Sequence, residues 1–194
     1  MALDPLYLFV LAGLFTPGPN VILITASGAR FGMAATRPHI AGVVVGVGIT
    51  SALTTLGIGA LLLAAPALGL ALQIVAAGWI LWMAFRLLTA RPGEDGDRAR
   101  PFTFVEAVLF QWVNPKVWAV AMAASSGYAS DLPAHLEAAR IASAFSGLNL
   151  LVCVFWAGAG RLLAYLLTTH AAWRAFTTIM AIALAASAGM IFLH

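Results

Sequence analysis

Long apolar segments separated by short polar stretches dominate this sequence. A helix needs about 20 apolar residues to cross a bilayer. Six segments reach roughly that length, and they run over 5–26, 38–63, 67–89, 103–126, 139–166 and 171–193. Only 9% of the residues are charged, whereas soluble domains carry about 25%, so most of the surface must face lipid. The sequence therefore predicts an all-α integral membrane protein with six transmembrane helices in a single domain, residues 1–194.

The basic residues between these segments favour one side of the membrane. Cytoplasmic loops carry an excess of lysine and arginine. The loops after the first, third and fifth segments, together with the segment ends beside them, contain Arg30, Arg37, Arg86, Arg91, Arg98, Arg100, Arg161 and Arg174, whereas the opposite side has only Arg140. These stretches are therefore expected in the cytoplasm, with both termini in the periplasm. Basic residues scattered in this way form no stripe, so no nucleic acid is expected as a partner.

Proline motifs interrupt two of the apolar segments. The first segment contains TPGPN at residues 16–20, and the fourth contains NPK at residues 114–116. Proline lacks a backbone N–H and its ring clashes with the carbonyl four residues earlier, so neither motif can continue a regular helix. Backbone groups released in this way persist at membrane depth only where protein or a water-filled cavity satisfies them. Both helices are therefore predicted to be broken.

The two breaks occupy equivalent places in the two halves of the chain. Pro19 and Pro115 are 96 positions apart, close to half of the 194 residues, and each lies in the first helix of a three-helix half. Two successive halves with an odd number of helices take opposite orientations in a membrane. The sequence thus predicts a 3+3 inverted repeat: repeat 1 over about 1–90, a cytoplasmic linker over about 91–101, and repeat 2 over about 102–194. Interrupted helices at matching places point to a binding site near the midplane.

The breaks offer suitable groups for binding a small zwitterion. A broken helix exposes N–H groups with partial positive charge at the start of its second half, and free carbonyls at the end of its first half. Lys116 adds a full positive charge near mid-depth, where an ionisable residue is usually functional. A zwitterionic amino acid matches both kinds of group. The predicted substrate-binding residues are Pro17, Gly18, Pro19, Asn20, Gln111, Asn114, Pro115, Lys116 and Asn149.

Three of these polar residues also have a purely structural interpretation. Lys116 can extend to the membrane interface along its apolar stem. Gln111 stands one turn before the second break and can satisfy the backbone groups released there. Asn149, in the middle of the fifth segment, can bond to a neighbouring helix without contacting substrate.

Two features outside the breaks also bear on fold and function. Glu106 is a candidate for proton coupling if burial raises the pKa of its carboxyl group. The alternative is an acid at the start of a helix, which the helix dipole favours. Gly42, Gly46 and Thr50 form a small-residue stripe at four-residue spacing, and such a stripe predicts close helix packing rather than a binding site.

Several short motifs of this chain occur together in one known family. They are residues 17–20, then Ser27 and Gly32, residues 114–116 at the start of the second half, and GWILW at 78–82. On these motifs, and over its whole length, the chain resembles the LysE/RhtB amino-acid exporters. The resemblance implies a multi-pass protein of the bacterial inner membrane that exports amino acids or related small metabolites. It also implies that an ion gradient drives export, with proton antiport expected.

Two other functional classes remain as alternatives. An intramembrane enzyme would need a nucleophile and a base, and a dyad of Lys116 with Ser125 or Ser143 has no support in the spacing. An ion or small-solute channel would need a continuous polar face, which the predicted helices lack. There is no Walker A motif and no metal-ligand spacing, so we expect no catalytic residue, metal or cofactor. The expected partners are an amino-acid-like solute and the lipid bilayer, and the sequence leaves a homo-oligomer open.

Overall fold

The computed structural model describes residues 4–59, 64–89 and 100–192, and within them all regular structure is helical. The helices are α1 (Pro5–Phe15), α2 (Pro19–Thr55), α4 (Pro66–Leu88), α5 (Phe104–Trp112), α6 (Pro115–Gly127), α7 (Ala134–Leu166) and α8 (His170–Met190). Four of them, α2, α4, α7 and α8, are each long and apolar enough to cross a membrane. The prediction of an all-α membrane protein is therefore confirmed. The predicted linker 91–101 lies mostly outside the described residues.

The two proline motifs end helices, as the sequence predicts. The first helix, α1, stops at Phe15, and α2 starts at Pro19 after an extended Gly18. In the second half, α5 stops at Trp112 and α6 starts at Pro115. Each proline that opens a helix stands at its first position, where the missing N–H has no intrahelical partner to lose. Both predicted interruptions are present.

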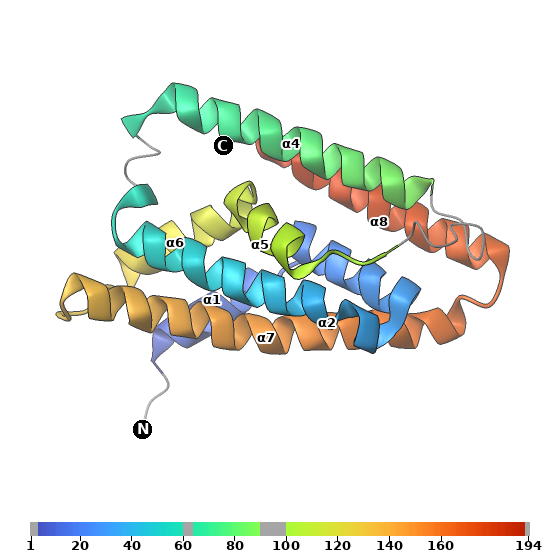
Figure 1. Ribbon diagram of the computed structural model, residues 1–194, viewed down its shortest axis with the longest axis horizontal. Coiled ribbons are helices and arrows are strands. Elements are labelled where there is room, and N and C mark those ends of the chain that lie inside the picture. Colours follow the sequence, from blue (N-terminus) through green and yellow to red (C-terminus); the bar gives the residue numbers. More distant parts are fainter. Residues whose placement is uncertain (1–3, 60–63, 90–99, 193–194) are drawn as a thin grey trace.

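The predicted boundary between the first two apolar segments is wrong in detail. The sequence placed a non-helical stretch at 27–37, but α2 continues through both Arg30 and Arg37. Only Gly32 leaves helical geometry, with φ 74° and ψ 173°. Glycine adopts positive φ without a steric penalty, so a single residue suffices for the turn. Figure 1 shows the chain reversing its direction at this point of α2.

The helices pack as two groups with α5 between them. Over much of its length α2 lies against α7, and α4 packs on α8 (Figure 1). One buried apolar cluster joins α1, α2, α5, α6 and α7, and a second joins α2, α4, α5 and α8. The short helix α5 packs against the second part of α2. A Cβ added at Gly42 would lie 2.3 Å from the Phe104 carbonyl oxygen, and a Cβ added at Gly46 would lie 2.6 Å from Gln111 Cγ. The packing interpretation of this glycine stripe is confirmed.

Large apolar side chains also cover the outside of the bundle. Phe85 on α4 is 63% exposed, and Leu162 on α7 is 67% exposed. Many other leucine, isoleucine and phenylalanine side chains on α4, α7 and α8 are exposed in the same way. Soluble monomers rarely expose apolar surface of this extent. The outer surface is therefore suited to lipid.

Candidate functional site

The two helix breaks face each other, and Lys116 joins them. Its ammonium group, at the start of α6, donates a hydrogen bond to the carbonyl oxygen of Thr16, which ends α1. The lysine stem crosses directly over Gly18, because a Cβ added at Gly18 would lie 2.8 Å from Lys116 Cδ and 3.1 Å from Nζ. The glycine between the two prolines therefore makes room for a side chain that lies 98 positions further along the sequence. A carbonyl released by the first break is satisfied by a cation from the second.

A second link joins the breaks through two side-chain amides. Asn20 Nδ2 donates to Gln111 Oε1 at 2.8 Å, and Gln111 Nε2 donates to Asn20 Oδ1 at 3.2 Å. Gln111 also donates to the Ala107 carbonyl at 2.9 Å. The break itself is closed by its own backbone, since Asn114 N donates to the Gln111 carbonyl at 3.3 Å. Gln111 thus bonds to the opposite break rather than to the backbone groups released beside it.

A small cavity of about 20 Å³ lies between the breaks and α7. Its polar lining comes from Gly18, Asn20, Asn114, Lys116 and Asn149, all of which the sequence predicts as site residues. The predicted Pro17, Pro19 and Pro115 shape the backbone around it, and Gln111 reaches it only through Asn20. The structure therefore brings the predicted residues together, while their contact with a substrate stays a prediction.

Two amide groups in this cavity have unused hydrogen-bonding capacity. The Oδ1 atom of Asn114 and the Nδ2 atom of Asn149 are buried and have no hydrogen-bond partner. Buried polar groups are nearly always paired, so an unpaired one calls for an explanation such as a ligand or water. Cys153, which approaches Asn149 Oδ1 at 3.8 Å, and Trp156 also line the cavity. Sequence reasoning missed both, although Cys153 follows Asn149 at the four-residue spacing of one helix face.

Glu106 lies away from the breaks, at the first turn of α5. Its carboxylate accepts from Arg100 at 2.6 and 2.7 Å and from the Thr103 backbone N–H at 2.8 Å. Thr103 in turn caps the helix, because its hydroxyl accepts from the Glu106 N–H at 3.2 Å. This reciprocal arrangement is a capping box. The carboxylate raises the pKa of Arg100, which precedes the helix, above its ordinary value through their hydrogen bond.

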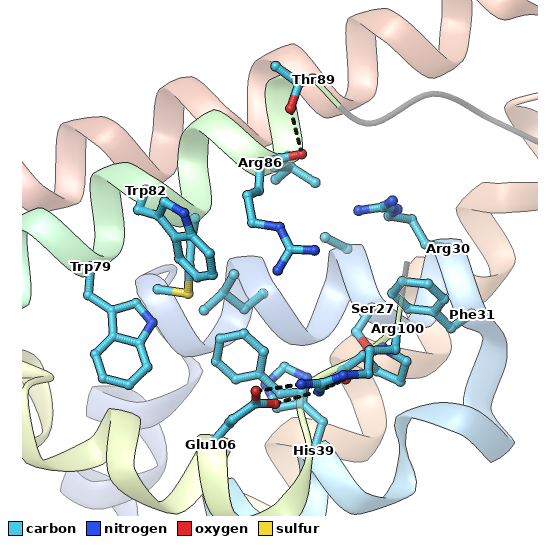
Figure 2. Close-up of a pocket in the computed structure, with 16 residues that line it drawn as sticks. Ser27, Arg30, Phe31, His39, Trp79, Trp82, Arg86, Thr89, Arg100 and Glu106 are labelled. Carbon is cyan, nitrogen blue, oxygen red and sulfur yellow. Dashed lines mark hydrogen bonds and ion pairs between the residues drawn. The ribbon is translucent and has the colours of Figure 1, made fainter. Parts of the chain in front are cut away.

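A much larger cavity, of about 420 Å³, lies beside Glu106 between α2, α4 and the start of α5. Figure 2 shows the guanidinium groups of Arg30 and Arg86 directed into it, with Trp79 and Trp82 along one wall. The sequence analysis did not predict this cavity. Its residues are spread from position 23 to position 106, and no single motif contains more than a few of them.

Among the described residues, no group of metal-ligating side chains is present. Facing helix breaks with polar groups between them are typical of membrane transporters. The family model for the LysE type translocator matches residues 11–193, so the chain belongs to that family. This confirms the resemblance that the sequence motifs predict. It also places the chain among transporters rather than enzymes.

Curated relatives of the chain share one description. A cysteine/O-acetylserine efflux protein of Escherichia coli (strain K12) is 32% identical over 116 residues, which are 59% of this chain and 59% of the relative. A protein of the same description from Shigella flexneri has the same identity and coverage, and one from Escherichia coli O1:K1 is 31% identical. The chain thus aligns with less than two thirds of the length of these relatives. No solved structure shows a significant match.

Proposed function

We propose that this chain is a secondary exporter of amino acids or related small zwitterionic metabolites across the bacterial inner membrane. The observation that carries the proposal is the Lys116 bridge to Thr16, beside one small cavity that is also lined by an unpaired amide oxygen and an unpaired amide N–H group. Family membership and the efflux relatives support the same conclusion. O-acetylserine and cysteine are therefore the first substrates to test.

The small cavity between the breaks, lined by Gly18, Asn20, Asn114, Lys116 and Asn149, is called the seam. It has one set of groups for each charge of a zwitterion. The Lys116 ammonium and the Asn149 amide N–H can receive the carboxylate, together with the free N–H groups at the start of α2 and α6. The Thr16 carbonyl and the Asn114 amide oxygen can receive the ammonium group. In this conformation Lys116 occupies the Thr16 carbonyl. The substrate must therefore displace Lys116 and draw it towards its own carboxylate.

The cavity must widen before a substrate fits. Its volume of about 20 Å³ has room for about one water molecule, whereas amino acids are several times larger. We therefore interpret this conformation as one in which the seam is closed. Movement of the two breaks apart, coupled to Lys116 release, would open it.

We infer that the closed seam lies at the centre of a six-span, 3+3 inverted repeat, with repeats over about 1–90 and 102–194 joined by the linker 91–101. Counted this way, α1 with the first part of α2 forms one span, and α5 with α6 forms its counterpart, running in the opposite direction in Figure 1. The helix contacts support this assignment of spans to the two repeats, because the first part of α2 packs on α7 and the second part of α2 packs on α5. Rocking of one repeat against the other would expose the seam to alternate sides.

The orientation that we propose follows from the distribution of the arginines. The end of α4 and the start of α8 lie at one end of the bundle, and the start of α7 lies at the opposite end (Figure 1). Arg86 is in the last turn of α4 and Arg174 is near the start of α8, whereas Arg140 is near the start of α7. Arg30 and Arg100 line the same cavity as Arg86. The charge bias of short loops assigns the arginine-rich end to the cytoplasm. Both termini are then periplasmic, and the proton gradient is the proposed driving force.

Counterflow in proteoliposomes tests the proposed function. Vesicles that contain the full chain and a high internal concentration of O-acetyl-L-serine are expected to take up labelled O-acetyl-L-serine transiently, whereas protein-free vesicles are not. A pH gradient, acidic outside a vesicle that presents the periplasmic face, is expected to accelerate efflux. Absence of counterflow for O-acetylserine, for cysteine and for every other common amino acid would contradict the exporter proposal.

Replacement of Glu106 by glutamine distinguishes its two interpretations. The carboxylate is already bound by Arg100 and Thr103, and these contacts favour its ionised form, so we propose that it caps α5 rather than carrying the coupled proton. Glu106→Gln is therefore expected to keep gradient-driven efflux within about two-fold of wild type, with a small loss of thermal stability because surface ion pairs contribute little. Efflux that no longer responds to the pH gradient, with counterflow retained, would instead assign coupling to Glu106.

A further inference from the structure

The large cavity at the arginine-rich end is separate from the seam between the breaks. The two cavities share no lining residue, because they lie on different faces of the first part of α2. Leu23, Ser27 and Arg30 face the large cavity, whereas Val21 and Ile24 face the seam. The large cavity, at about 420 Å³, falls in the size range of small-molecule sites. In this conformation it can hold a metabolite, and the seam cannot.

Among the described residues, the lining of the large cavity carries an excess of positive charge. In this part of the chain, three guanidinium groups, from Arg30, Arg86 and Arg100, face it together with one carboxylate, that of Glu106. Glu106 is engaged by Arg100. Arg86 lies over the Trp82 ring at 5.1 Å, and no acidic side chain among the described residues pairs with it. The Arg86 guanidinium, which Figure 2 shows directed into the cavity, keeps its fork of donors for a ligand.

Two further polar side chains in the lining are buried without a partner. His39 is 2% exposed, and neither of its ring nitrogens has a hydrogen-bond partner. Trp79 Nε1 is likewise buried and unpaired. Both residues line this cavity, from α2 and α4 respectively. Together with Arg86 they provide donors for an anionic group, and the indole rings of Trp79 and Trp82 provide an apolar wall.

We propose that this cavity is a loading site, in which Arg86 binds the carboxylate of a small amino-acid-like solute before the solute moves to the seam. The inference rests on the proposed exporter function and adds a second site to it. Arginine suits this task, because its planar fork matches a carboxylate with two parallel hydrogen bonds. Glu106 is already paired to Arg100 and takes no part in binding the ligand.

Comparison of a carboxylic acid with its ester tests the loading site directly. The full-length protein, purified in detergent, is titrated calorimetrically with O-acetyl-L-serine and with its methyl ester, which lacks the carboxylate charge. Wild-type protein is expected to bind the acid at least about ten-fold more tightly, the effect of a charged hydrogen bond. Arg86→Gln is expected to lose this preference, and Arg86→Lys to keep part of it. Arg174→Gln, which removes an exposed arginine at the same end of the bundle and outside both cavities, is expected to keep all of it.

Two outcomes separate the loading site from the exporter function. Lys116→Ala is expected to lose counterflow yet retain the Arg86-dependent preference for the acid, because its side chain lies in the other cavity. If wild-type protein shows counterflow but Arg86→Gln, folded by size-exclusion chromatography, discriminates acid from ester as wild type does, the loading site is wrong and the exporter stands. If wild-type protein shows neither binding nor counterflow of any amino acid tested, both proposals fail.

Discussion

Lys116→Ala is expected to lower the initial rate of O-acetylserine counterflow at least about 30-fold while the protein remains folded. The substitution removes the only charged side chain that lines the seam among the described residues, together with its hydrogen bond to Thr16. In the proposed mechanism Lys116 pairs with the substrate carboxylate. Loss of one partner of such a charged pair costs about 2–5 kcal/mol, and 2 kcal/mol corresponds to a factor of about 30. The rate is measured in proteoliposomes that contain equal amounts of each variant.

Two further variants separate the charge of Lys116 from its packing. Lys116→Met keeps an unbranched stem over Gly18 without the charge, and it is expected to be as inactive as the alanine variant. Arg161→Ala removes an exposed cation on α7 that lines neither cavity, and it is expected to transport at the wild-type rate. Counterflow at the wild-type rate in Lys116→Ala would show that Lys116 does not bind the substrate. The contact between the two breaks would then have a structural role only.

The sequence located the seam because proline chemistry is local. Each motif at 16–20 and 114–116 prevents a helix wherever it occurs, so both breaks could be predicted without knowledge of their neighbours. That the two breaks face each other followed from their symmetric positions. Which groups meet did not follow, because the contacts of Lys116 with Thr16 and of Asn20 with Gln111 depend on how α2 and α5 pack.

The large cavity could not be predicted for a related reason. It depends on the position of α4, which carries apolar residues on every side, so its sequence gives no indication of which face is turned inward. Trp79 and Trp82 resemble interface anchors in sequence, and Arg86 resembles a loop cation that sets topology. Only the packing of α4 on α8 brings these residues beside α2.

Helix boundaries were the least accurate part of the fold prediction. The fifth segment was expected to start at 139, but α7 starts at Ala134 and includes Glu137 and Arg140. Charged residues were taken as a sign of a loop. Here they satisfy one another, since Arg140 bonds to Glu137 at 3.0 Å and to Asp4 at 2.8 Å, and a paired charge can remain inside a helix. The Asp4 partner is 136 positions away and therefore invisible in a sequence window.

Gly160→Ala is expected to lower the apparent melting temperature by about 10 °C or to prevent accumulation of folded protein. At the crossing of α2 and α7, a Cβ at Gly160 would lie 2.1 Å from the Thr25 carbonyl oxygen and 2.9 Å from its carbon. The obstruction is backbone, so no side-chain rotation can relieve it, and the helices must separate. Overpacking costs about 1–3 kcal/mol and sometimes more, and each kcal/mol shifts the melting temperature of a chain this size by about 2–4 °C.

The same substitution two residues earlier provides the control. A Cβ at Gly158 would meet no atom within 4 Å, and alanine is a better helix former than glycine. Gly158→Ala is therefore expected to melt at or slightly above the wild-type temperature, in the same detergent and by the same fluorescence assay. The crossing is reciprocal, because a Cβ at Gly28 would lie 2.2 Å from the Ala157 carbonyl oxygen. Equal melting temperatures for Gly160→Ala and Gly158→Ala would show that α2 and α7 do not touch there. The α2–α7 crossing would then not hold together the helices that surround the seam.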